Sequence, residues 1–94
     1  MALTLNTVKL EPITIDGQAY VPDVTVERRL RLAKASGDGE ITESMLDLMS
    51  ECFGTQKEEV LKKLKQLSVI NVFKLQMYLL SGDDGIKAFE EREK

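Results

Sequence analysis

The stretch that most constrains the fold of this 94-residue chain is residues 68–80, SVINVFKLQMYLL. Helical spacing gives it one apolar stripe, formed by Ile70, Phe73, Met77 and Leu80. A second apolar set widens the stripe: Val69, Val72, Leu75 and Leu79. A helix that is apolar around most of its circumference is buried by its own chain or by a partner. We expect the first stripe to lie in the core. The second set is a candidate interaction surface, covered by the hairpin described next, by a second subunit or by a client protein.

The N-terminal part of the chain predicts a β-hairpin. Asp16-Gly17 lies between β-favouring segments, and this dipeptide suits a type I′ turn because both central residues need positive φ. We expect strands over residues 7–15 and 18–21, with Pro12 on an edge strand because it lacks an amide hydrogen. A two-stranded hairpin is marginal alone, so it must pack on helices or pair with another chain through its residue 8–15 edge. Ile13 and Ile15 are candidate interaction residues on that edge.

Three amphipathic helices are predicted between the hairpin and the apolar stretch, over residues 25–35, 43–53 and 55–67. Their expected inward stripes are Val26/Leu30/Ala33, Met45/Leu48/Met49/Cys52 and Val60/Leu61/Leu64/Leu67. Thr25, Thr42 and Ser68 are placed as N-caps, Thr55 and Glu58 have capping-box spacing, and Gly54 is placed to end the second helix. The predicted fold is therefore mainly α with a short N-terminal β-hairpin (α+β), a small helical bundle of four to five helices.

One domain is expected over residues 1–94. It divides into a hairpin arm (1–22), a helical core (23–82) and a short last helix with a frayed tail (83–94). Arg28, Arg29 and Arg31 lie on the first helix, either as a solvated face or as a basic patch for an acidic partner, and they are candidates for a polar contact between subunits.

Composition argues against catalysis and favours binding. The chain has no His, and its single cysteine, Cys52, lies on an apolar stripe, so no Cys–His pair can form. We predict no catalytic, cofactor-binding or metal-binding residue. The net charge of −3 argues against nucleic acid as a partner, and the absence of a long apolar run argues against a membrane.

The order of these parts resembles the small tail assembly chaperones of long-tailed bacteriophages. The resemblance rests on residues 15–20 (IDGQAY), 45–54 (MLDLMSECFG) and 57–73, and it spans about Thr7 to Leu80. It implies a non-enzymatic protein that binds the helical tape measure protein, keeps it soluble and helps the tail tube to polymerise. It further implies contact with the tail tube protein through a longer frameshifted form, a homo-oligomer, and residence in the host cytoplasm but not in the mature virion.

Two other functions are left open by the residues. Two short helices joined at Phe53-Gly54-Thr55, with lysines around Lys62, are compatible with a DNA-binding regulator of helix-turn-helix type. Interleaved glutamates and the acidic net charge argue against it. A structural or adaptor protein of the virion would share the helical domain but stay in the particle.

Overall fold

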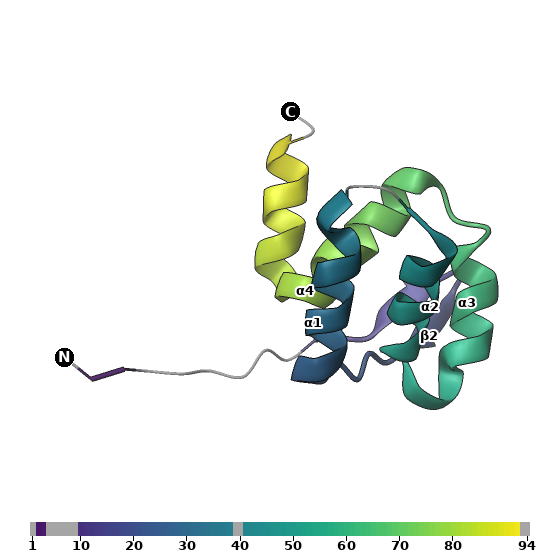
Figure 1. Ribbon diagram of the computed structural model, residues 1–94. Helices are drawn as coiled ribbons and strands as arrows, with labels where there is room; N and C mark the ends of the chain where they lie inside the picture. Colours follow the sequence, from purple (N-terminus) through teal and green to yellow (C-terminus); the bar gives the residue numbers. More distant parts are fainter. Residues whose placement is uncertain (1, 4–9, 39–40, 93–94) are drawn as a thin grey trace.

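The computed structural model describes residues 2–3, 10–38 and 41–92, and in these ranges a β-hairpin precedes four α-helices (Figure 1). The hairpin consists of β1 (Ile13–Ile15) and β2 (Gln18–Tyr20). The helices are α1 (Val26–Ala35), α2 (Glu43–Glu51), α3 (Lys57–Leu64) and α4 (Val69–Arg92), with 3-10 turns at Ser36–Asp38 and Gly54–Gln56. The predicted class, mainly α with an N-terminal hairpin, is confirmed.

The hairpin forms at the predicted turn but with shorter strands. Asp16 and Gly17 have φ of 52° and 83°, as a type I′ turn requires, and β1 pairs antiparallel with β2 so that Ile15 faces Gln18 and Ile13 faces Tyr20. Residues 7–9 of the expected first strand lie outside the described ranges, and residues 10–12 are not strand. The strand begins after Pro12, which has no amide hydrogen to donate to a ladder.

The first two helices begin where the sequence predicts. The Thr25 hydroxyl accepts a hydrogen bond from the Arg28 amide, and the Thr42 hydroxyl accepts one from the Met45 amide, each at 3.2 Å. α2 ends two residues earlier than the predicted Phe53, and Gly54 follows with a φ of 59° that favours glycine.

The predicted capping box of the third helix does not form. α3 begins at Lys57, after the 3-10 turn that holds Thr55, and no side chain caps its start. The helix also ends at Leu64 and not at residue 67. A backbone hydrogen bond from the Gln56 amide to the Phe53 carbonyl closes the turn at 3.2 Å, and it takes the place of the expected side-chain cap.

The inward face of α1 differs from the predicted stripe. Val26 and Leu30 are 71% and 66% exposed and Ala33 is exposed, whereas Leu32 is fully buried. The face that turns inward carries an arginine, whose Nε donates to the Leu79 carbonyl at 3.3 Å. This residue is Arg29, which is half-buried and reaches a backbone acceptor of α4 with its guanidinium. Such contacts fix the rotation of α1 about its axis.

The buried face of α4 is the reverse of the predicted one. Val72, Leu75 and Leu79 are 3%, 8% and 0% exposed, so these three proposed interaction residues belong to the core. Within the expected core stripe, Ile70 is 57% exposed and the other members are half-buried. Both sides of this helix are apolar, so periodicity alone cannot choose between them. The core of the domain joins this face to α1, α2, α3 and the hairpin.

A glycine bends α4 and separates it into two parts. Gly82 has φ 62° and ψ −141°, and the chain after it (yellow in Figure 1) runs in a new direction and stays helical to Arg92. The short last helix predicted within residues 83–94 is present, and it extends to Arg92, where part of the frayed tail was expected. Gly85 allows the second part to pack on the first, since a Cβ at Gly85 would lie 2.2 Å from the Met77 carbonyl oxygen.

The assignment of α4 faces gives a first prediction. Leu79→Ala should lower the free energy of unfolding by about 2–5 kcal/mol, because it empties a fully buried position. Ile70→Ala, on the exposed side of the same helix, should change it by about 0.5 kcal/mol or less. Urea unfolding followed by circular dichroism measures both variants. A larger loss for Ile70→Ala than for Leu79→Ala would contradict the observed burial.

A second prediction concerns the bend. Helix propensity alone would make Gly85→Ala stabilising by about 1 kcal/mol. We expect a net loss of about 1–3 kcal/mol, because the new methyl group meets a backbone carbonyl and the two parts of α4 must move apart. Gly37→Ala is the control, since a Cβ there meets nothing within 4 Å. Thermal unfolding should show the two alanines acting in opposite directions, and equal effects would contradict the close contact.

Candidate partner-binding surfaces

The hairpin is attached to α3 by polar contacts at both ends of β2. Lys63 Nζ donates to Asp16 Oδ2 at 3.1 Å, and the Tyr20 hydroxyl donates to Glu59 Oε1 at 3.0 Å. Glu59 lies four residues before Lys63, a spacing that suits an ion pair along the helix. In the structure Glu59 and Lys63 each bind the hairpin instead, so the charged side of α3 holds the hairpin in place.

The same contacts shift two pKa values upward. Burial, with the neighbouring Glu59 carboxylate, raises the pKa of Tyr20, because both disfavour the phenolate. The hydrogen bond to Asp16 raises the pKa of Lys63, because the carboxylate favours the ammonium form. The protonated forms of both side chains are thus the ones that hold the hairpin.

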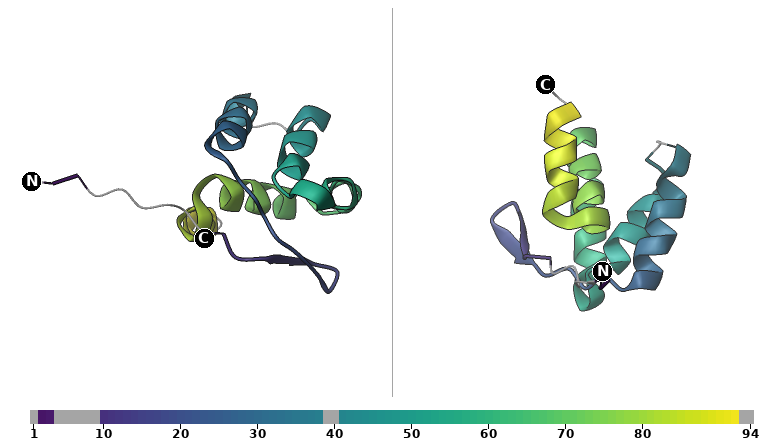
Figure 2. Two further views of the ribbon diagram at one scale, coloured as in Figure 1. Left: turned by 90° about the horizontal axis from the view of Figure 1, so that it is seen from below. Right: turned by 90° about the vertical axis from the view of Figure 1, so that its left-hand side faces the viewer.

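A tyrosine of α4 holds the segment before β1. The Tyr78 hydroxyl accepts a hydrogen bond from the Glu11 amide at 2.7 Å and donates to the Glu11 carbonyl at 3.1 Å. With Asp16 held by Lys63 at the other end, β1 lies alongside the first part of α4, as the left view of Figure 2 shows. The strand is therefore positioned from both ends.

A groove of about 520 Å³ separates β1 from α4. One wall consists of residues 12–16 of the hairpin, and the other is formed by α4 and its flanks. The α4 side comprises Leu67, Asn71, Lys74, Leu75, Tyr78 and Ile86. A groove of this size, with an apolar lining and a few polar groups, has the properties of a binding site.

The groove is lined by some of the predicted site residues and by others that were not predicted. Ile13, Ile15 and Leu75 line it, but Ile15 and Leu75 are buried and Ile13 is half-buried in the domain's own packing. The α4 wall also contains polar residues that were not predicted from the sequence as site residues: Asn71, Lys74 and Tyr78. The sequence does contain a pattern that indicates this wall, because these polar or amphipathic residues recur at i, i+3 and i+7 on an otherwise apolar helix.

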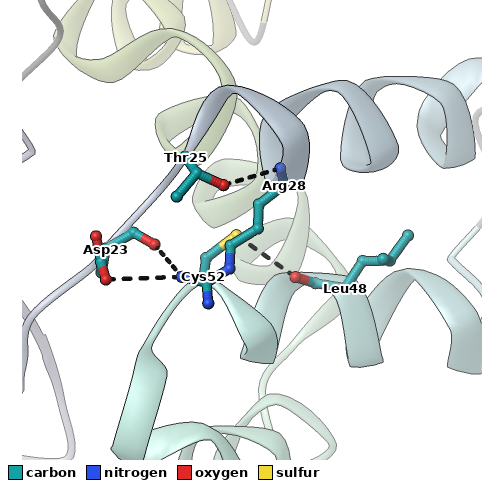
Figure 3. A network of polar contacts seen from close by, with 5 residues as sticks. All are labelled: Asp23, Thr25, Arg28, Leu48 and Cys52. Carbon is teal, nitrogen blue, oxygen red and sulfur yellow. Dashed lines mark hydrogen bonds and ion pairs between the residues drawn. The ribbon is translucent and has the colours of Figure 1, made fainter.

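The three arginines of the predicted subunit contact are engaged within the chain. Arg28 donates to the Asp23 carbonyl at 2.7 Å and lies 3.7 Å from its carboxylate, as Figure 3 shows. Arg29 binds the α4 carbonyl described above, and Arg31 pairs with Glu27 on the surface of α1. A role for these residues between subunits stays a prediction.

Cys52 lies beside Arg28 and is buried. Its thiol donates to the Leu48 carbonyl at 3.4 Å (Figure 3). Its own carbonyl accepts a hydrogen bond from the Asp23 amide. Burial raises the pKa of the thiol, which keeps it protonated and poorly nucleophilic. The position of Cys52 is that of a small core residue linking α2 to the start of α1.

Exposed apolar side chains gather on two helices. One group, the α1 patch, consists of Val26, Leu30 and Ala33, which recur at i, i+4 and i+7. The other, the α4 start, consists of Val69 and Ile70, which are 62% and 57% exposed. Val69 is thus the one member of the proposed α4 interaction set that the structure places at the surface.

Comparisons with family models, curated proteins and solved structures find no match for this chain. In the described ranges no cluster of three or more His, Cys, Asp or Glu residues is placed to hold a metal ion. No helix among the described residues is both long and apolar enough to cross a bilayer.

The raised pKa of Tyr20 gives a third prediction. A group whose pKa is higher in the folded state stabilises the fold below its unfolded pKa, here about 10, and loses that contribution as pH rises through the folded value. Unfolding free energy should therefore fall above about pH 10. Tyr20→Phe should cost about 1 kcal/mol at pH 7, through the lost hydrogen bond, and make the alkaline decline shallower.

The control for this prediction is Glu59→Gln, which keeps an acceptor for the Tyr20 hydroxyl but removes the charge. Its alkaline decline should lie between those of the wild type and Tyr20→Phe. Urea titrations at several values between pH 7 and pH 11 measure all three proteins. The same slope for Tyr20→Phe and the wild type would show that Tyr20 does not carry the effect.

Proposed function

We propose that this chain is a non-enzymatic assembly chaperone of the phage tail type, which binds the tape measure protein and keeps it soluble until the tail tube polymerises. The observation that carries the proposal is the α1 patch, where Val26 and Leu30 are 71% and 66% exposed on adjacent turns of one helix. Large apolar side chains at helical spacing on a surface are suited to a partner helix with its own apolar face.

The charges beside the α1 patch suit a client that is helical and mixed in charge. Arg31 and Glu27 form an ion pair on the exposed side of α1, and Lys34 is exposed near its C-terminal end. Such rim charges contribute to the rate and specificity of association, while the apolar stripe supplies most of the binding free energy. The α4 start offers a second, smaller apolar contact.

The remaining parts of this proposal follow from the family resemblance. They are a homo-oligomer, contact with the tail tube protein through a longer frameshifted form, action in the host cytoplasm, and absence from the mature virion. The resemblance assigns no role to nucleic acid or to a membrane.

The regulator alternative has less support. α2 and α3 are joined by a tight turn, but Lys57 lies 3.7 Å from Glu51 and Lys63 lies 3.1 Å from Asp16. Lysines already paired with carboxylates are poorer ligands for phosphates, and the net charge of the chain is −3. A structural virion protein is distinguished from a chaperone by mass spectrometry of purified particles, which should detect only the former.

Co-expression with apolar helical fragments of a tape measure protein tests the proposal. The wild type should keep a fragment in the supernatant after centrifugation, and the double variant Val26→Ser/Leu30→Ser should bind it at least about tenfold more weakly because two apolar anchors are lost. Lys62→Ser, at an exposed position on α3 outside the α1 patch, is the control and should bind as the wild type does.

Circular dichroism and urea unfolding should show all three proteins equally folded, because the altered side chains are exposed. Fragments that stay insoluble with the wild type would reject the chaperone function. Fragments bound equally by the wild type and the double variant would reject the α1 patch as the client site.

A further inference from the structure

The outer edge of β1 has backbone groups that β2 does not use. Ile15 and Gln18 flank a two-residue turn, so they form a hydrogen-bonded pair, and Ile13 and Tyr20 form the next one. Antiparallel pairing alternates, so Thr14 directs its N–H and C=O away from β2. The sheet of the described ranges contains only β1 and β2, which leaves this edge without a neighbouring strand.

This edge borders the groove between β1 and α4. The opposite wall presents Asn71, Lys74, Leu75 and Tyr78, which form one stripe of the helix at i, i+3, i+4 and i+7. A strand edge facing a helix across an apolar groove is the arrangement that binds a peptide by strand addition. The backbone of the incoming segment pairs with the edge, while its side chains contact the helix.

The position of α4 favours a single strand over a hairpin as the occupant of the groove. Adjacent strands lie about 4.8 Å apart, and α4 bounds the groove on the side away from β1. A second hairpin pairing through this edge would have to place its other strand where α4 lies. A single extended segment has no second strand to place on the α4 side.

The charge in the groove further restricts the kind of segment that can bind. Lys74 is exposed on the α4 wall, and in the described part of the chain no ion pair engages it. The carboxylate on the opposite wall, Asp16, is already paired with Lys63. The groove therefore presents one uncompensated positive charge between apolar residues, which favours a carboxylate.

We infer that the groove between β1 and α4 binds an extended, acidic segment of a partner protein as a third strand beside Thr14. The segment carries apolar side chains at alternate positions over Leu67, Leu75 and Ile86, and an Asp or Glu opposite Lys74. The site is separate from the α1 patch and does not depend on the proposed helical client.

Selection from a yeast-displayed library of random nine-residue peptides, on the purified full chain, provides the probes. We expect enriched peptides with alternating apolar residues and at least one acidic residue. Synthetic copies of them, titrated into the ¹⁵N-labelled protein, should shift the Thr14 amide resonance and slow its exchange with solvent. Peptides that bind without any effect on Thr14 would overturn the inference.

Charge reversal tests the role of Lys74. Lys74→Glu should weaken the acidic peptides by about three- to tenfold and improve binding of the same peptides with Lys in place of the acid. Lys62→Glu, an exposed position of α3 outside the groove lining, should leave both affinities unchanged. The same preference for acidic peptides in the wild type and Lys74→Glu would overturn the assignment of the carboxylate.

A pair of proline variants tests strand addition. Thr14→Pro removes an amide hydrogen from the edge beside the groove, and Ala19→Pro removes the corresponding one from the opposite edge of the hairpin. Peptide affinity should fall more than tenfold for Thr14→Pro and stay within about twofold for Ala19→Pro, with the helical signal unchanged in both. Equal affinities for the two variants would overturn strand addition.

A peptide of the chain's own residues 2–10, ALTLNTVKL, separates a foreign partner from a second copy. It lacks an acidic residue, so we expect it to bind at least about threefold more weakly than the selected peptides. Tighter binding of this peptide in the groove would assign the site to a second copy and overturn the proposed partner.

Discussion

Burial of one face of α4 determines the positions of the other elements. Val72, Leu75 and Leu79 lie against the core, and Arg29 of α1 binds the Leu79 carbonyl from the side. Since α1 is held by Arg29 and the buried Leu32, its apolar residues Val26 and Leu30 point outward. The chain therefore exposes apolar surface on α1 because its core is completed by the other face, and this exposure is what suits the domain to bind a partner.

The hairpin is held mainly by its edges and ends and less by its own pairing. Three residue pairs are too few to make a two-stranded sheet stable in water. Contacts with Lys63, Glu59 and Tyr78 hold it against two helices, and Ile15 and Tyr20 add apolar burial. These contacts fix β1 at a distance from α4 that leaves a groove, so the same interactions stabilise the arm and define a binding site.

Much of the fold follows from local signals in the sequence. Asp16-Gly17 predicts the turn because its backbone angles are special, and Thr25, Thr42 and Ser68 predict helix starts because a side chain there satisfies a free amide. These signals depend on the residue and its nearest neighbours alone. The failed capping box at Thr55 shows the limit, since a 3-10 turn satisfied the backbone in another way.

The surfaces could be predicted less well, because they depend on which of two apolar faces is buried. In α4 both faces are apolar, and in α1 the inward face carries Arg29, whose partner is the carbonyl of Leu79, far away in sequence. Nothing in the spacing of Val26, Leu30 and Ala33 shows that they lie outside. In the sequence, the polar groove residues of α4 are recognisable only as interruptions of an apolar helix. That they line one groove follows only once the hairpin is placed beside them.

The hydrogen bonds between Tyr78 and Glu11 affect which substitutions this protein can tolerate. The tyrosine hydroxyl binds the amide and the carbonyl of residue 11 and not its side chain. Almost any amino acid except proline can supply those two groups. Residue 11 can therefore change without loss of this contact, whereas the side chain that makes the contact is that of position 78.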